Sequence, residues 1–254
     1  MNVSLIPYII LILMGAAWGL SIPLTKITVS TGYGQFGLIF WQFVIAVIVL
    51  GFVLIVRRKR PLFERKTIFL FIVLALLGTI FPNSASYVAT YYLPASFIAI
   101  LIATVPMFSF PIAMLMGLEK KDFRRISGLF IGLIGVFVLT GPEASFPDRH
   151  LLIFIPLALL APFFYAIEGN YVDKYGTAGQ DPIQTFTGAS ILGTFLILPV
   201  TISTGQWIDP FQPWPIENYT HVASSCCHAF AYCAYVWLVS RAGAVFTAQV
   251  AYFV

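Results

Sequence analysis

Charged side chains are scarce in this chain. Asp, Glu, Lys and Arg together make up 9% of its 254 residues, whereas hydrophobic residues make up 59%. A soluble globular domain carries about 25% charged residues. So few charges cannot cover the water-exposed surface of a domain of this size, which excludes an ordinary soluble fold. The composition favours a chain dissolved in a lipid bilayer, where apolar side chains are accepted directly.

The chain also has few of the groups that form disulfides, metal sites or nucleotide sites. Its three cysteines, Cys226, Cys227 and Cys233, lie in one apolar segment and do not suggest a disulfide framework. A metal site that combines them with His228 is disfavoured, because adjacent helix positions point about 100° apart. Neither a Gly-x4-Gly-Lys-Ser/Thr loop nor a His-Glu-x-x-His motif occurs. We therefore expect no metal, no cofactor and no catalytic residue.

Long apolar segments fill most of the sequence. A helix needs about 20 mostly apolar residues to cross a bilayer. The predicted helices are Ile6–Lys26, Phe36–Val56, Thr67–Thr90, Ala95–Gly117, Phe123–Thr140, Leu151–Val172, Ile183–Thr204, Tyr219–Ser240 and Ala242–Val254. The first is expected to be a retained helix rather than a cleaved signal peptide, because it is long and no basic residues precede it. The predicted fold is an all-α, polytopic membrane protein.

The basic residues indicate how the chain crosses the membrane. The net charge of +4 does not point to nucleic acid, because the basic residues form short clusters between apolar runs. If the N-terminus is cytoplasmic, all but two of the 14 basic residues, Lys26 and Arg149, fall on the cytoplasmic side. Cytoplasmic loops of membrane proteins carry such an excess of Lys and Arg. We predict a multi-pass protein of the inner (plasma) membrane with a cytoplasmic N-terminus.

Two pairs of segments suggest an internal repeat. The run Trp18–Lys26 aligns with Tyr165–Asp173, and Pro94–Ala99 aligns with Gly243–Ala248, both at an offset of about 148 residues. A repeat of five helices is odd in number, so its two copies would insert in opposite directions. We predict a first five-helix repeat at residues 1–145 and an incomplete second repeat at 146–254, with helices six to eight and part of helix nine.

Several short segments carry a resemblance to a known family. They are Gly15-Ala16-Ala17-Trp18-Gly19 with Pro23 and Lys26, then Leu93-Pro94-Ala95, Val105-Pro106-Met107-Phe108, Leu118-Glu119-Lys120-Lys121, and Gly128, Gly132 and Gly135. In this order and spacing they resemble the drug/metabolite transporter superfamily, in its ten-helix EamA-type branch. The resemblance implies two inverted five-helix repeats around a central cavity and export of small metabolites. Compared with that pattern, the ten-helix fold is expected to be truncated within helix nine.

Polar side chains within apolar helices are costly, so each is expected to have a partner, a cavity or a function. Glu168 is the one carboxylate well inside a predicted span. It could contact a substrate amine, couple transport to a proton, or reach interfacial water one turn from Asp173. Lys26 is expected to reach the interface from the outer end of its helix, with a contact to a substrate carboxylate as the alternative.

Two polar stripes are candidate cavity walls. Asn83, Ser86, Tyr87 and Tyr91 recur at helical spacing, with hydrogen bonding between helices as the alternative. His221, Ser225, His228, Tyr232 and Tyr235 share one face of the eighth helix, where two histidines also allow a proton relay. The candidate substrate-binding residues are Trp18, Ser21, Gln42, Asn83, Tyr87, Tyr91, Glu168, Asn170, His228, Tyr232 and Gln249. Gly128, Gly132 and Gly135 are interpreted as a close-packing face.

The predicted function is secondary transport of a small metabolite, such as an amino acid or an amphipathic compound, by alternating access. The expected partners are a small-molecule substrate and the lipid bilayer. Proton coupling and a homodimer are left open. The alternatives are a non-transporting assembly or sensor subunit and, less favoured, a membrane-embedded transferase, for which no Asp-rich motif is present.

Overall fold

A computed structural model describes residues 5–140 and 149–254, and every element of regular secondary structure in these residues is helical. The predicted repeat boundary after residue 145 lies outside these residues. The elements are α1 (Ile6–Val29), α2 (Gln35–Val56), α3 (Arg65–Ala75), η1 (Leu76–Ile80), α4 (Phe81–Tyr92), α5 (Ala95–Ile102), α6 (Val105–Leu115), α7 (Phe123–Thr140), η3 (Arg149–Phe154), α8 (Ile155–Tyr175), α9 (Pro182–Ser203), α10 (Ile216–Ala242), α11 (Ala244–Thr247) and η4 (Ala248–Tyr252).

Seven helical segments among the described residues are long and apolar enough to cross a membrane. They are Ile6–Val29, Gln35–Val56, Arg65–Tyr92, Ala95–Leu115, His150–Tyr175, Pro182–Ser203 and Ile216–Ala242. The predicted fifth helix, Phe123–Thr140, is helical over the same residues as α7 but is not among the seven. The predicted ninth helix is the short α11 followed by the 3₁₀ turn η4. The prediction of an all-helical, multi-pass membrane protein is confirmed.

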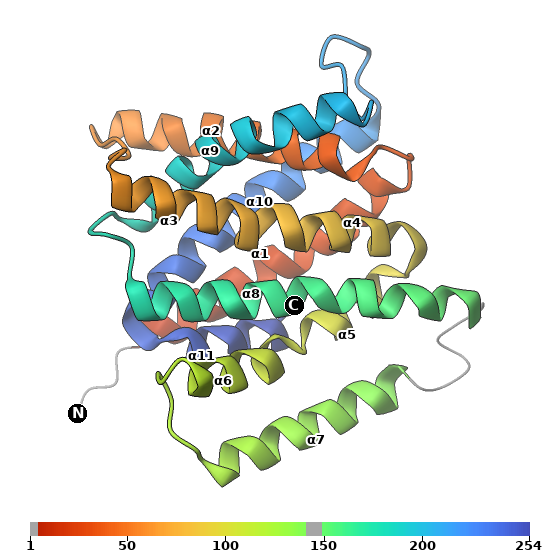
Figure 1. The fold of residues 1–254 in the computed structure, drawn as a ribbon. Coiled ribbons are helices and arrows are strands. Elements are labelled where there is room, and N and C mark those ends of the chain that lie inside the picture. Colours follow the sequence, from red (N-terminus) through yellow and green to blue (C-terminus); the bar gives the residue numbers. More distant parts are fainter. Residues whose placement is uncertain (1–4, 141–148) are drawn as a thin grey trace.

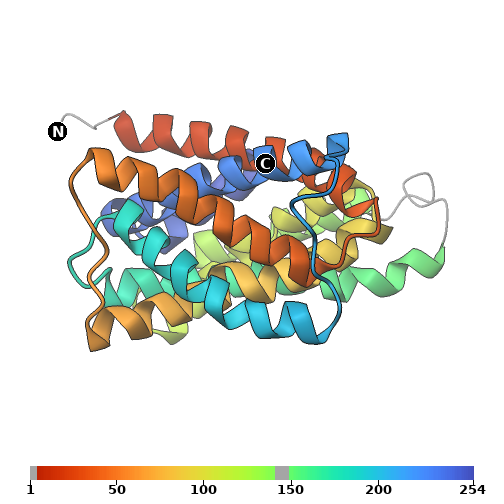
Figure 2. The same cartoon turned by 90° about the horizontal axis from the view of Figure 1, so that it is seen from above.

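The helices form one bundle in which neighbours in space are often distant in sequence (Figure 1). α1 packs along α10, α2 along α9, and α4 along α8 (Figures 1 and 2). α7 lies at the edge of the bundle and contacts α5 and α6. We call the end that carries loops 57–64, 116–122 and 176–181 the basic end, and the end with loops 30–34 and 204–215 the opposite end.

Contacts at the basic end join loops that are far apart in sequence. The carboxylate of Asp181 accepts hydrogen bonds from the N–H groups of Ile183 and Gln184, both at 3.1 Å, and so caps α9. The same carboxylate pairs with Arg57 at 3.1 Å and Lys59 at 2.9 Å. The loop between α2 and α3 is thereby fixed to the loop between α8 and α9.

The third membrane segment is not a continuous α-helix. Its middle, η1, is a π-helical turn that directly precedes α4, where Pro82 takes one of the first two positions. Proline has no N–H, and its ring clashes with the carbonyl four residues earlier, which accounts for a widened turn at this point. The π-turn ends at Ile80, two residues before Pro82.

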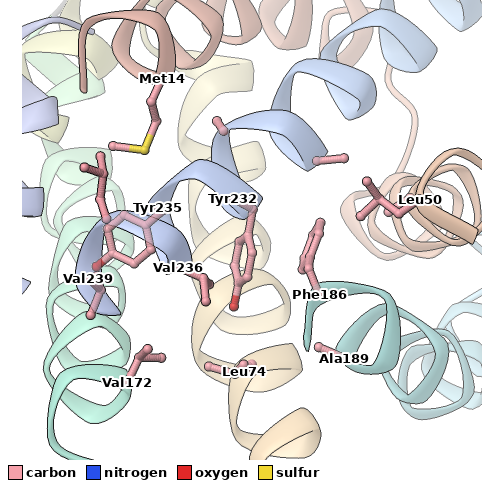
Figure 3. Close-up of a cluster of buried hydrophobic side chains, with 14 of the residues drawn as sticks. Met14, Leu50, Leu74, Val172, Phe186, Ala189, Tyr232, Tyr235, Val236 and Val239 are labelled. Carbon is pink, nitrogen blue, oxygen red and sulfur yellow. The ribbon is translucent and has the colours of Figure 1, made fainter. Parts of the chain in front are cut away.

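The largest buried cluster joins α1, α2, α3, α8, α9, α10 and η4 (Figure 3). Within it the rings of Phe186 and Tyr232 stack, with centroids 3.9 Å apart and planes 19° apart. Close packing through glycine occurs on α9, where a Cβ on Gly188 would overlap the Phe71 ring. The predicted close-packing face is wrong for Gly128 and Gly135, because a Cβ on either would meet no described atom within 4 Å. Gly128 lies on the wall of a cleft of about 470 Å³ beside α7.

Candidate functional site

A small cavity lies in the middle of the bundle, between α1, α2, α4, α5, α8 and α10. Its volume is about 50 Å³. Trp18 and His228, near the middle of α1 and α10, are part of its wall. The polar groups on that wall come from Ser21, Thr25, Gln42, Asn83, Ser86, Tyr87, Thr90, Tyr165, Ser224 and His228. We call this space the central cavity.

A chain of hydrogen bonds between side chains organises one wall of the central cavity. The side-chain oxygen of Gln42 accepts hydrogen bonds from Asn83 Nδ2 at 2.8 Å and from the Tyr87 hydroxyl at 2.6 Å. The Tyr165 hydroxyl donates to Asn83 Oδ1 at 3.1 Å. All four residues are buried. The chain therefore ties α2, α4 and α8 together and holds both amides in defined orientations.

A second, smaller space of about 20 Å³ adjoins the central cavity and contains Glu168. The two spaces share Trp18, Tyr165 and His228 as wall residues, and the smaller one is completed by Glu168, Ala231, Tyr232 and Tyr235. We call it the Glu168 chamber. Glu168 is 1% exposed, and its carboxylate accepts a hydrogen bond from the Tyr232 hydroxyl. The expectation that Glu168 reaches interfacial water is therefore wrong.

The local helix geometry leaves space for the Glu168 carboxylate. Gly78 lies in the π-turn η1, and a Cβ added to it would overlap both carboxylate oxygens of Glu168. Tyr232 is held in turn by its stack on Phe186 (Figure 3). The carboxylate is thus fixed between Gly78, which has no side chain, and the hydroxyl of Tyr232, which is held by the ring stack.

His228 contributes an unsatisfied polar atom at the junction of the two spaces. Its Nε2 is buried and has no hydrogen-bond partner among the described residues. A water needs roughly 10–15 Å³ of accessible space, so both spaces have room for water or for a polar group of a solute beside this nitrogen. Burying an unpaired polar atom is costly, which favours a bound partner there. His221, the other histidine of α10, instead has its Nε2 3.0 Å from the Leu38 carbonyl oxygen.

A larger cleft of about 380 Å³ opens at the opposite end. Tyr91 and Tyr92 lie on its wall, and Tyr87 lies on the walls of both this cleft and the central cavity. Tyr87 therefore separates the two. Lys26 is outside both spaces, since its Nζ donates to the carbonyl oxygens of Thr90 and Tyr91 at 2.7 and 2.9 Å. It binds the C-terminal end of α4, where a cation is favoured.

Eight of the eleven predicted site residues lie around the two internal spaces, and the other three do not. Tyr91 is 46% exposed in the outer cleft. Asn170 faces α6, where its Nδ2 donates to the Ser109 carbonyl at 3.0 Å and the Ser109 hydroxyl at 3.1 Å. Gln249 donates to Val245 of its own turn at 3.2 Å and faces a separate 470 Å³ cleft beside α7. Their placement indicates packing or surface roles.

Tyr165 was not among the predicted site residues, although it contributes to both spaces. Its ring meets that of Trp18 edge-on, with centroids 5.2 Å apart. The alignment of Trp18 with Tyr165 in the two repeats was a signal that could have identified it. Ser224 was also missed, because it is offset by one position from the stripe that runs through His221, Ser225 and His228.

Comparison with known proteins gives the family of the chain. A search of the curated proteins found no match. A family model described as the EamA-like transporter family matches residues 5–141, which extend from the beginning of α1 to the end of α7 and make up more than half of the chain. The resemblance in the N-terminal segments is therefore confirmed, and the chain belongs to the EamA-like transporter family of the drug/metabolite transporter superfamily.

Proposed function

We propose that this protein is a secondary carrier that moves a small metabolite, of amino-acid size or amphipathic, through the central cavity. The observation that carries the proposal is the wall of Gln42, Asn83, Tyr87 and Tyr165, which are buried within membrane-spanning helices. Polar groups at that depth are costly and mark solute pathways. A cavity with a few convergent polar groups between helices is also the usual form of a small-molecule site.

The helix contacts support alternating access between two inverted repeats. In the proposed repeat, α1 corresponds to α8, and the α3–α4 segment corresponds to α10. The repeat therefore relates the contact between α1 and α10 to the contact between α8 and α4. Both contacts are extensive. The internal spaces lie between these helices. Binding sites of inverted-repeat carriers lie at this interface, where rocking of one half exposes them to either side.

The contacts at the two ends of the bundle support a conformation in which the central cavity is closed toward the basic end and approached by a cleft from the opposite end. There the 380 Å³ cleft approaches the central cavity and ends at Tyr87. At the basic end, Asp181 of the second proposed repeat pairs with Arg57 and Lys59 of the first. If the basic end is cytoplasmic, transport requires Tyr87 to move on one side and these ion pairs to break on the other.

The size of the central cavity also bears on the mechanism. Ligand pockets typically measure about 300–1,000 Å³, whereas this cavity measures about 50 Å³. A metabolite therefore cannot enter without movement of its walls. This fits a carrier that encloses its substrate and does not fit an open channel.

Reconstitution tests the proposal. The purified chain in sealed liposomes should exchange at least one member of a panel of labelled amino acids and amphipathic amines in a counterflow assay. Asn83→Leu should abolish the exchange, and Gln249→Leu, outside the internal spaces, should preserve it. Absence of exchange by folded protein would support an assembly or sensor subunit instead. Chemical turnover of a substrate in detergent, without vesicles, would support a membrane-embedded transferase.

A further inference from the structure

The walls of the Glu168 chamber have an unusual chemical composition. One carboxylate, Glu168, is enclosed by the aromatic side chains of Trp18, Tyr165, Tyr232 and Tyr235. No described Lys or Arg contributes to either this chamber or the central cavity. An ionised carboxylate so deeply buried is costly unless a cation pairs with it. The charge of Glu168 is therefore balanced either by a bound proton or by a cation that comes from outside the protein.

Aromatic rings around a carboxylate form a site for an ammonium group. The faces of Trp and Tyr rings attract cations, and the attraction is larger when the site is desolvated. Trp18 and Tyr165 both line the chamber, and their rings pack edge-to-face with planes 77° apart. Tyr232 donates its hydroxyl hydrogen to Glu168, which orients the carboxylate without neutralising its charge. An ammonium group could replace or share this hydrogen bond.

His228 gives an independent indication that a ligand belongs here. Its unpartnered Nε2 lies on the wall shared by the chamber and the central cavity. A solute with its ammonium group at Glu168 would extend into the central cavity past this nitrogen. The amide chain of Gln42 and Asn83 lies on the wall of that cavity. The wider space next to the chamber is thus suited to the uncharged remainder of the solute.

We propose that the Glu168 chamber binds the ammonium group of a monocationic, ring-bearing solute, in competition with a proton on Glu168. When the solute binds to the protonated form, the carboxyl group releases one proton and forms an ion pair with the ammonium group. A zwitterion or an anion is disfavoured, because the internal spaces offer no described cation for its carboxylate. The inference rests on the proposed carrier function and specifies its substrate class.

The titratable groups that face Glu168 come from its own helix, α8, and from α10. Tyr165 lies on its own helix, and His228, Tyr232 and Tyr235 come from α10. The π-turn η1, which packs against Glu168 through Gly78, contains no titratable residue. A proton released on cation binding near neutral pH is therefore assigned to Glu168 or, as the competing source, to His228.

Calorimetric titration of the purified 254-residue chain in detergent tests the inference. Phenethylammonium is the cationic probe, and 2-phenylethanol, phenylalanine and 3-phenylpropionate are its neutral, zwitterionic and anionic counterparts. Only the cation is expected to bind, and the observed heat should change with the ionisation heat of the buffer because a proton is released. Glu168→Gln should weaken binding by at least about tenfold, since it removes the charge of the site. His228→Gln should leave unchanged the number of protons released for each cation that binds.

Glu119→Gln is the matched control. It makes the same chemical change at the basic end, where Glu119 pairs with Arg125 at 2.9 Å, and it should keep wild-type affinity. If Glu168→Gln does not fold, Tyr232→Phe provides a second variant, because it keeps the ring stack. It should alter the affinity for the cation, and the neutral probe should still not bind.

Three results would overturn the inference: equal binding of the neutral or anionic probe, unchanged affinity in Glu168→Gln, and cation binding without proton release. The outcome for the carrier function is separate. If the protein exchanges other solutes in liposomes but binds no cation, the ammonium site is contradicted and the carrier function is supported. If it binds the cation but exchanges no solute, the ammonium site is supported and the carrier function is contradicted.

Discussion

The Tyr232 hydroxyl donates a hydrogen bond to the carboxylate of Glu168, and this contact joins α10 to α8 in the middle of the bundle. Tyr232 is itself fixed by the ring of Phe186 on α9. The position of one carboxylate therefore depends on three helices that are separate in sequence. The predictions that follow test this arrangement, the amide chain beside it, the contacts at the basic end and the orientation in the membrane.

Gly78→Ala is expected to destabilise the protein by about 1–3 kcal/mol, because the added methyl group would overlap the Glu168 carboxylate. Thermal unfolding in detergent measures the effect. Gly51→Ala is the matched control, since a Cβ on Gly51 meets no described atom within 4 Å and alanine favours a helix. Equal melting temperatures for the two variants would show that the space beside Gly78 is not needed by Glu168.

Gln42→Leu is expected to reduce solute exchange strongly while costing only about 1 kcal/mol of stability. The substitution leaves Asn83 Nδ2 and the Tyr87 hydroxyl without their shared acceptor, and single hydrogen bonds between membrane helices average about 0.6 kcal/mol. Liposome counterflow and thermal unfolding measure the two effects. A Gln42/Asn83 double-mutant cycle should show coupling, and strictly additive effects would contradict the proposed amide chain.

Asp181→Asn is expected to weaken closure of the basic end. It removes ion pairs with Arg57 and Lys59, which are partly exposed and worth roughly 0.2–1 kcal/mol each. A cysteine pair placed across the α2–α3 and α8–α9 loops should cross-link more slowly in this variant than in wild type. Asp173→Asn is the control, because the Asp173 carboxylate instead accepts a hydrogen bond from the Ala244 N–H at 2.8 Å. This variant should leave the cross-linking rate unchanged.

The same contact predicts a pH dependence of stability. Burial raises the pKa of Asp181, but the hydrogen bonds from Lys59 and the Gln184 N–H, together with the charges of Arg57 and Lys59, outweigh it and hold the pKa below its ordinary value of 3.8. The depressed pKa means that the stabilisation is complete above pH 3.8 and is lost as the pH falls further. The difference in melting temperature between wild type and Asp181→Asn should be constant above about pH 5 and shrink below pH 3.8. A difference that already disappears near pH 6 would contradict the contact.

The proposed orientation can be tested by labelling from one side of the membrane. In a variant without the native cysteines, Lys59→Cys and Lys121→Cys should react with a membrane-impermeant maleimide only from the cytoplasmic side. Tyr33→Cys, in the loop between α1 and α2, should react only from the other side. Labelling of positions 59 and 121 from opposite sides would contradict both the orientation and the helix count on which the inverted repeat depends.

Individual residues show how far the candidate site could be predicted from the sequence. Helical spacing correctly grouped His228 and Tyr232 on one face of α10, and it correctly grouped Asn83 and Tyr87 on one face of α4. It could not separate these from Asn170, which points to Ser109 on α6. A polar side chain in an apolar helix has the same sequence pattern whether it faces a cavity or another helix. The difference depends on which helix lies opposite.

Composition and the lengths of the apolar segments determined that this chain is helical and crosses a membrane several times. Its few charges cannot cover a water-exposed surface, and its apolar segments match the bilayer thickness. The segments from Gly15 to Gly135 also sufficed to indicate its family. Only the tertiary structure decided that Glu168 is enclosed by rings from α1, α8 and α10 and accommodated by Gly78. The reason is that such an enclosure depends on contacts between helices far apart in sequence, which the periodicity of any single helix does not encode.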